Sequence, residues 1–318
     1  MLLINEDEVR QLLPMDECID VLDRLFADAG QGQTANVSRY RMSLPKGLHH
    51  NLAGMSMAFG ASGLKTYVSA GGGSPAKMLV LIYSMETGEP LTLMSANALG
   101  QIRTGAASGV ASNYMARENA QTVGVIGSGY QAETQLAAVC GVRSITQAWV
   151  YSRAPEKRDS FAERMTAQLG ISVAAVETPE AAVAESDVVI TITNSREPVF
   201  NGDSLRPGTH INAAGSNHWI RRELDETTIR RSDLIVVDDL PQAKIECGEL
   251  LWAHERRAFR WEQVIELGTV VVGAHKGRPS ENAITLFESQ GIGIEDVAAG
   301  MHVYQKAIAQ GLGRQVEL

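Results

Sequence analysis

The stretch Val123-Gly124-Val125-Ile126-Gly127-Ser128-Gly129-Tyr130-Gln131-Ala132 decides the fold of this chain. Strand-forming residues lead into a glycine-rich turn, and a helix-compatible run over 133–139 follows at once. Strand, Gly-x-Gly-x-x-Ala and helix in this order form the loop that holds a dinucleotide pyrophosphate. Gly127 permits the tight turn, Gly129 lets the backbone approach the phosphates, and Ala132 lets the helix pack closely on the strand. Because the first N–H groups of the helix would face the anion, we predict dinucleotide contacts over residues 127–132.

The composition is that of a globular protein with about two domains. The chain has 318 residues, of which 44% are hydrophobic and 20% charged, and its net charge of −9 speaks against nonspecific nucleic-acid binding. The three cysteines, Cys18, Cys140 and Cys247, are too widely spaced for a metal motif, so we expect no metal and a reducing, cytoplasmic compartment. The N-terminus lacks a basic region and no apolar run reaches ~18 residues, so we expect neither a signal peptide nor a membrane span.

Strands and helices alternate after about residue 120. The strands are expected at 123–126, 148–151, 173–176, 188–193, 210–213 and 234–237, and helices at 133–140, 155–169 and 178–184. The apolar run 188–193 is typical of a central parallel strand, and Pro155 is well placed in the first turn of its helix. This alternation predicts an α/β fold with a Rossmann-type, doubly wound parallel sheet over residues 118–294.

The first part of the chain follows a different pattern. Residues 6–28 are expected to be helical with a break near Pro14, and 38–93 to form strands with turns at 45–47, 71–75 and 86–90. Within that region, 78–83 is a buried-strand candidate and is followed by a hairpin. Residues 96–115 suggest a tightly packed helix or helix pair. The helical segment 294–310 is expected to return to this part, which predicts a discontinuous α+β domain of residues 1–117 and 295–318.

The end of the second strand of the nucleotide domain bears on the choice of cofactor. An acidic residue there would bind the ribose 2′-OH of NAD, but this chain has Ser152 and Arg153. A hydroxyl and a guanidinium suit a 2′-phosphate, so we predict NADP(H), with NAD(H) as the alternative. The competing interpretation is that Arg153 stacks near the adenine or points into solvent.

Several short motifs, in order along almost the whole chain, resemble the ornithine cyclodeaminase/μ-crystallin family, which includes archaeal-type alanine dehydrogenases and cyclic imino acid reductases. They are Gly63-Leu64-Lys65, Arg103-Thr104-Gly105-Ala106-Ala107, the glycine loop, Gly208-Thr209-His210-Ile211-Asn212-Ala213, Gly215-Ser216-Asn217, Arg222-Glu223-Leu224-Asp225, Val237-Asp238-Asp239, Gln242-Ala243 and Phe287-Glu288-Ser289-Gln290-Gly291. The resemblance implies a homodimer paired through the first domain, which also binds substrate, and an active site between the two domains.

The resemblance also implies roles for three basic residues. Lys65 matches the family's active-site lysine, and Arg41 and Arg103 match its arginines at the substrate carboxylate. The chemistry agrees, since interconversion of an imine and an amine needs a carboxylate anchor, a proton shuttle and a hydride partner. Neighbouring cations would lower the pKa of Lys65 toward the working range. Each role has a structural alternative: a surface lysine, an internal ion pair for Arg103, and Arg39 in place of Arg41, since both face one side of a strand.

Cofactor contacts follow from the same matching. Thr193 and Asn194 end the central strand, and Ala214 to Asn217 should line the nicotinamide side. The remaining matched contacts are Arg103, Thr104, Gly215, Ser216, Arg221 and Ser289.

One departure from the family pattern concerns Asn217. Cyclodeaminases and archaeal alanine dehydrogenases carry a catalytic aspartate here, and an amide cannot accept a proton as a carboxylate does. Asn217 can still orient a carboxylate, a water or an imine N–H, so we keep it among the catalytic candidates.

The function expected is therefore an NAD(P)-dependent oxidoreductase. It would reduce a 2-imino acid, either a cyclic ketimine or the product of a 2-oxo acid and an amine, to an L-amino acid, or catalyse the reverse. Two alternatives stay open: an ornithine cyclodeaminase that gives proline and ammonia, and a non-catalytic crystallin-like protein that binds NADPH and a small ligand.

Overall fold

The computed structural model describes residues 1–70 and 76–317, so the turn expected at 71–75 lies outside the described residues. The chain divides into two compact units. One comprises Met1–Arg103 with Gly291–Leu318, and the other comprises Thr104–Gln290. Helix α3 (Asn97–Met115) runs without interruption through the first division point. Because α3 is one continuous helix, its hydrophobic pattern does not mark the boundary between the two units at residues 103 and 104.

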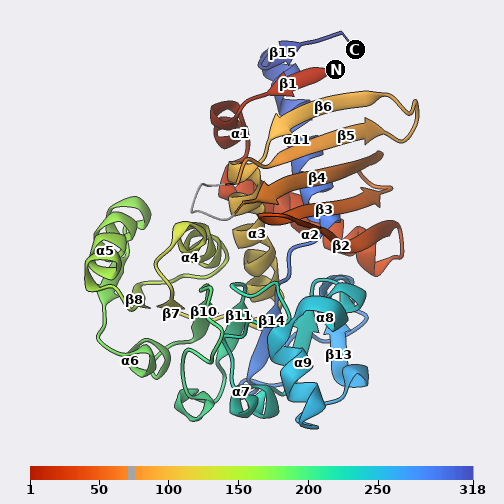
Figure 1. Ribbon diagram of the computed structural model, residues 1–318. Coiled ribbons are helices and arrows are strands. Elements are labelled where there is room, and N and C mark those ends of the chain that lie inside the picture. The colour runs from red at the N-terminus through yellow and green to blue at the C-terminus, as the bar shows by residue number, and fades with distance from the viewer. Residues whose placement is uncertain (71–75, 318) are drawn as a thin grey trace. The chain divides into compact units, whose positions relative to one another are not determined.

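The second unit is built on a parallel sheet with the order β13-β12-β14-β11-β10-β7-β8-β9 (Figure 1). Its strands are β7 (Thr122–Ile126), β8 (Gln147–Tyr151), β9 (Ser172–Ala175), β10 (Val188–Thr191), β11 (His210–Ala213), β12 (Leu234–Val237), β13 (Val264–Glu266) and β14 (Thr285–Glu288). Its helices are α4 (Tyr130–Val142), α5 (Pro155–Leu169), α6 (Pro179–Val183), α7 (Glu226–Arg231), α8 (Leu240–Glu246), α9 (Gly248–Glu255) and α10 (Leu267–Val271), with short 3₁₀ turns at Gly202–Ser204 and Trp261–Gln263.

Both faces of this sheet are covered, as the alternation of side chains along β10 shows. Val188 and Ile190 pack into the hydrophobic cluster that includes Ala132 and Leu136 of α4, whereas Val189 packs into the cluster on the other face. Strands buried on both faces read as continuous apolar runs, which is why the sequence pattern found β10, whereas β14 was missed. The predicted doubly wound α/β fold is confirmed.

The order of strands reverses between β7 and β10. From β7 the chain proceeds outward through β8 and β9, and then returns to β10 on the other side of β7. Loops at the carboxyl ends of such neighbouring strands diverge, and this crevice is where doubly wound sheets bind ligands. The glycine loop follows β7 directly.

The first unit holds a mixed sheet with the order β15-β1-β6-β5-β4-β3-β2 (Figure 1). Its strands are β1 (Leu2–Ile4), β2 (Thr34–Leu44), β3 (Gly47–Ser56), β4 (Ala61–Ser69), β5 (Leu79–Ser84), β6 (Pro90–Ser95) and β15 (Arg314–Gln315). Its helices are α1 (Glu6–Leu12), α2 (Met15–Gly30) and α11 (Gly293–Gln310). The helix α11 packs on β3 and β4 and against α2, as expected from its sequence.

Two details of the first unit refine the sequence interpretation. The strand expected to be buried at 78–83 alternates instead: Val80 and Ile82 are buried, but Leu79 and Tyr83 are exposed. Only one face of β5 is therefore covered by helices.

The break near Pro14 is confirmed, since α1 ends at Leu12 and Pro14 is the N-cap of α2.

Candidate active site

The glycine loop of the second unit has the geometry of an anion cradle. Gly127 has a φ of +115°, a region that side chains disfavour, and a Cβ there would lie 2.4 Å from the carbonyl oxygen of Ile192. A Cβ on Gly129 would meet nothing within 4 Å, so the space in front of the loop is open. Gly129 is also the N-cap of α4 and has no side chain to cap the helix. The N-terminal end of α4, with its positive dipole end, follows this open space directly, and the residues fit a dinucleotide pyrophosphate.

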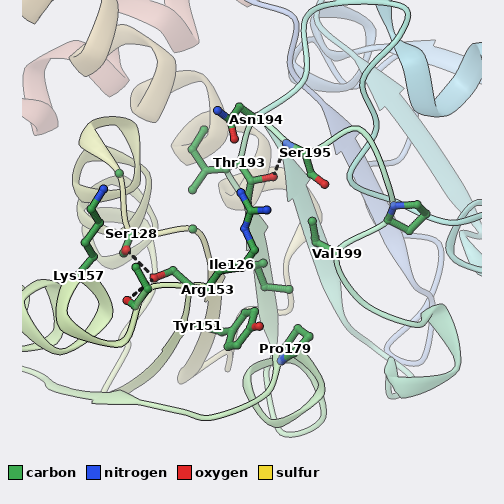
Figure 2. A pocket seen from close by; sticks show the side chains of 16 residues that line it. Ile126, Ser128, Tyr151, Arg153, Lys157, Pro179, Thr193, Asn194, Ser195 and Val199 are labelled. Carbon is green, nitrogen blue, oxygen red and sulfur yellow. Dashed lines mark hydrogen bonds between the residues drawn. The ribbon is translucent and has the colours of Figure 1, made fainter. Parts of the chain in front are cut away.

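A pocket of about 600 Å³ opens around this loop, and we call it the nucleotide pocket (Figure 2). Its walls are the loops after β7, β8 and β10 together with the start of α5 and α6. It is lined by Ile126, Gly127, Ser128, Gly129, Tyr151, Ser152, Arg153, Ala154, Lys157, Pro179, Ile192, Thr193, Asn194, Ser195, Pro198 and Val199. Seven of the residues predicted for cofactor binding are therefore brought together: Gly127, Ser128, Gly129, Ser152, Arg153, Thr193 and Asn194.

The end of β8 forms one wall of the nucleotide pocket. The Ser128 hydroxyl donates to the Ser152 hydroxyl over 2.9 Å, and Ser152 in turn donates to the Ala154 carbonyl at 3.2 Å. The hydrogen bond between the two hydroxyls joins the glycine loop to the end of β8 (Figure 2). Arg153 and Lys157 line the same wall with exposed side chains. Lys157 lies in the first turn of α5, where the helix dipole disfavours a cation unless an anion is nearby.

The other predicted cofactor residues of the second unit lie outside the lining of this pocket. Ala214–Asn217 follow β11, where the Ala214 N–H donates to the Thr191 carbonyl at 2.9 Å. The Ser216 hydroxyl donates to the Arg221 carbonyl at 3.0 Å, so those two predicted residues meet each other. Tyr130 and Gln131 begin α4, and Ala132 is a buried residue of the same helix. Thr104 lies on α3, and Ser289 follows β14.

The first unit contains a buried group of charged residues, which we call the charge cluster: Lys65, Arg103, Glu295 and Asp296. Lys65 on β4 is 3% exposed, and its Nζ lies 2.9 and 2.8 Å from the two carboxylate oxygens of Asp296. Arg103 on α3 donates from Nε to Asp296 at 2.9 Å and from Nη1 to Glu295 at 2.6 Å. Asp296 therefore pairs with two of the three predicted basic residues, Lys65 and Arg103, and the internal ion pair considered for Arg103 is present.

Burial sets the protonation behaviour of the charge cluster. Burial, followed by the charge of Arg103, lowers the pKa of Lys65 to about 8, against the opposing effect of Asp296. Burial also lowers the pKa of Arg103, but Asp296 and Glu295 more than offset this and raise it above its usual range. Burial raises the pKa of Glu295 despite the nearby Arg103 charge. A lysine that titrates near neutral pH is suited to proton transfer.

Arg39 and Arg41 occupy different surroundings on β2. Arg39 is 7% exposed, donates to the Gly291 carbonyl at 2.8 Å, and contributes to the lowered pKa of Lys65. Arg41 is half-buried and pairs in register with His50 on β3. Tyr40 and Met42 alternate with them and are exposed, so the two arginines share the inner side of β2, as expected, despite the register shift between Val37 and Tyr40.

Sequence reasoning missed the acidic partners in both units. Glu295 and Asp296 open α11 and looked like ordinary first-turn acids, which helix dipoles favour. Glu223 belongs to one of the motifs that carry the resemblance but had no role assigned, and it is fully buried. Lys157 carried a signal that could have been used: it lies four residues after Arg153, in the first turn of the next helix. Nothing local in the sequence indicated which distant groups the acids would contact.

No helix among the described residues is long and apolar enough to span a membrane.

Fold and site define a class of protein: an α/β chain of two units, one with a dinucleotide-type pocket at the switch point of a parallel sheet and the other with a buried lysine–arginine–carboxylate cluster. A sequence profile of the ornithine cyclodeaminase/mu-crystallin family matches residues 1–311. The chain belongs to this family, and the resemblance noted from the motifs is confirmed.

Relatives span the full length of the chain. Delta(1)-pyrroline-2-carboxylate reductase of Bacillus cereus is 33% identical over 100% of both chains. The solved structure of Thermococcus litoralis Delta(1)-pyrroline-2-carboxylate reductase with NADH and L-proline is 35% identical, with a TM-score of 0.95 over 99% of this chain and 100% of that one. An archaeal alanine dehydrogenase dimer with bound NAD is 34% identical, with a TM-score of 0.94 over 100% of this chain and 99% of that one.

Proposed function

We propose that the chain is an NAD(P)H-dependent reductase of 2-imino acids, which also runs in reverse as an amino acid dehydrogenase. The observation that carries this proposal is Lys65, a buried lysine with a pKa of about 8 that is held on Asp296 beside Arg103. The relatives named above, two imino acid reductases and an amino acid dehydrogenase, support the same reaction class.

The charge cluster supplies what the reaction needs from the protein. A bound nicotinamide would accept or deliver the hydride. Lys65 holds a proton at Nζ and transfers it to or from the substrate as the bond to nitrogen changes order. Arg39 and the two cations of the cluster, Lys65 and Arg103, bring positive charge together, and the pKa of the Glu295 carboxyl group beside them is raised, which favours an anionic substrate. Because Nε and Nη1 of Arg103 are paired, we assign Nη2 to the substrate carboxylate, with Arg41 as the second anchor.

For the cofactor we propose NADP(H) ahead of NAD(H). Arg153 and Lys157 place cations beside Ser152, where an NAD-specific domain would place a carboxylate. Helix α5 begins after Ala154, so the positive end of its dipole adds to the attraction for a phosphate. The relatives with NADH and NAD in their structures make this preference a point of difference to be tested.

We further propose a cytoplasmic homodimer. The cysteines Cys18, Cys140 and Cys247 are unpaired by disulfides, as expected for a reducing compartment. The dimer proposal rests on exposed apolar side chains of the sheet in the first unit, among them Val37, Tyr40 and Leu79, and it parallels the dimeric alanine dehydrogenase relative. Asn217 and the remaining matched cofactor residues keep the roles assigned to them from the family pattern.

The test is NADPH oxidation, followed by absorbance, with pyrroline-2-carboxylate, piperideine-2-carboxylate, and pyruvate mixed with ammonia or methylamine, repeated with NADH. We expect turnover on at least one imine and a preference for NADPH. Inertness on the whole panel would exclude the reductase. Release of ammonia from ornithine without net change of cofactor would then identify a cyclodeaminase, and nucleotide binding without either reaction would identify a binding protein.

A further inference from the structure

Glu223 is a fully buried carboxylate at the carboxyl edge of the parallel sheet. It lies between β11 and α7, and its side chain is 0% exposed. Its Oε1 accepts the Thr193 N–H at 2.5 Å, and its Oε2 accepts the Gly215 N–H at 2.9 Å. The two carboxylate oxygens thus bind the loops that follow two neighbouring strands, β10 and β11.

The two loops meet closely at this point. A Cβ on Gly215 would lie 2.4 Å from both the N and the O of Thr193, and 2.5 Å from Oε2 of Glu223. The Glu223 carbonyl also accepts the Val199 N–H at 2.8 Å. Thr193 and Val199 both line the nucleotide pocket, so this one residue fixes both ends of the pocket wall that follows β10.

Further buried acids lie behind Glu223. The Glu249 Oε1, in the first turn of α9, accepts the Glu223 N–H at 2.7 Å, and ligand-type atoms of Glu249, Glu288 and Cys247 lie within 4.8 Å of one another. Burial raises the pKa of Glu223 to about 7 against the hydrogen bonds from Thr193, and it raises the pKa of Glu249 to about 8 with a contribution from Glu223. Burying several carboxyl groups together costs free energy of folding, which indicates that these groups have a role that offsets the cost.

We propose that Glu223 is a positioning residue for the nucleotide pocket: its carboxylate clamps the loop after β10 to the loop after β11 and thereby sets nucleotide affinity. This inference rests on the proposed nucleotide site. Two acceptor oxygens at the correct reach are required, because each must satisfy a buried backbone N–H. The clamp acts on the shared pocket wall rather than on Arg153 or Lys157, so it serves NADH and NADPH equally.

The test compares Glu223→Gln with Asp187→Asn. Asp187 is the control, since it is also a buried carboxylate that accepts two backbone N–H groups, from Gln121 and Thr122, but it lies at the amino edge of the same sheet, where it also pairs with Arg117 and Arg206. The dissociation constants of NADH and NADPH are measured by fluorescence, alongside thermal unfolding. We expect Glu223→Gln to weaken both nucleotides by about tenfold or more, since one N–H loses its acceptor. Asp187→Asn should leave both constants within about twofold at a comparable loss of stability.

Two further measurements keep the outcome decisive. Glu223→Asp retains both oxygens but is one methylene shorter, so its affinity should fall between those of the wild type and Glu223→Gln. In the wild type, nucleotide binding should slow amide hydrogen exchange at residues 193–195 and at Gly215 together, a readout that does not depend on any variant folding. Slowing at 193–195 alone would contradict the clamp.

The failures are distinguishable. If the wild type binds nucleotide and a folded Glu223→Gln binds it as tightly, the clamp is overturned while the proposed function stands. If Asp187→Asn weakens binding as much as Glu223→Gln, the effect is general destabilisation and the clamp is again overturned. A wild type that binds neither nucleotide overturns the proposed function and this inference together.

Discussion

At the scale of the residue, Lys65 shows how a buried charge is made to titrate in a useful range. Its ammonium is removed from water, which disfavours the charged form, and Arg103 adds to that effect. Asp296 opposes both by direct contact, but it also pairs with Arg103. Sharing one carboxylate between two cations leaves Lys65 undercompensated, so its pKa settles near 8 instead of returning to that of an exposed lysine.

Lys65→Met should remove catalysis without removing the site. The methionine fills the same space, and Asp296 keeps Arg103 as a partner, so the fold should hold. We expect kcat/KM to fall by ~10²–10⁴-fold, the usual contribution of a proton-transfer group, while NADPH affinity stays within about threefold. Steady-state kinetics measure kcat/KM, and fluorescence titration measures the affinity for NADPH. An equal loss of both would contradict the assigned role.

The pH profile of the wild type provides the matching control. The ammonium form of Lys65 donates the proton in imine reduction, so kcat/KM for reduction should fall as pH rises through about 8. In the direction of amino acid oxidation the neutral amine of Lys65 is needed, so kcat/KM should rise with pH over the same range. Opposite slopes for the two directions assign the group as the proton carrier, and parallel slopes would point to another group.

At the scale of the element, the joint between β8 and α5 gathers the features of a phosphate site. The strand ends at Tyr151, Ser152 ties the turn to the glycine loop, and the helix begins at Pro155. Arg153 and Lys157 therefore stand on a short, anchored segment rather than on a free loop. A charge held in this way loses less entropy when it binds a phosphate than a mobile one.

Arg153→Ala and Lys157→Ala should each lower kcat/KM for NADPH by about tenfold, the loss of one charge-assisted hydrogen bond. NADH, without the 2′-phosphate, should change by less than about threefold, and the preference for NADPH should weaken with added salt. Arg164→Ala, on the same helix but paired with Glu133, is the control and should leave the NADPH/NADH ratio unchanged. Equal effects on both cofactors would mean that Arg153 stacks near the adenine instead.

At the scale of the whole molecule, the sheet of the first unit has two contrasting faces. Lys65, Leu52 and Val80 are in register on the face that carries buried residues. The opposite face carries an apolar row across four strands, formed by Val37, Ala53, Leu64 and Leu81. Its further exposed apolar side chains include Tyr40, Met42, Leu44, Val68 and Leu79. An apolar face of this extent is typical of an interface between protein chains.

Leu81→Lys should convert the proposed dimer into single chains, because it buries a charge within that row. Ile308→Lys is the matched control: Ile308 is 56% exposed on α11, so its substitution should leave the assembly intact. Sedimentation velocity gives the mass of each variant. A wild type with the mass of one chain, or a Leu81→Lys variant that stays dimeric, would exclude this interface.

The sequence by itself determined the doubly wound sheet, the glycine loop and the limits of several elements, because these depend on local periodicity and on turn residues. Strands β11 and β12 and helix α5 begin and end where the pattern predicts. The tertiary structure alone decided that Asp296, 231 positions from Lys65, meets its amine, and that Glu223 is buried beneath two loops. Hydrophobic spacing encodes which face of an element turns inward. It does not encode which distant polar groups meet there, since that depends on how the elements pack.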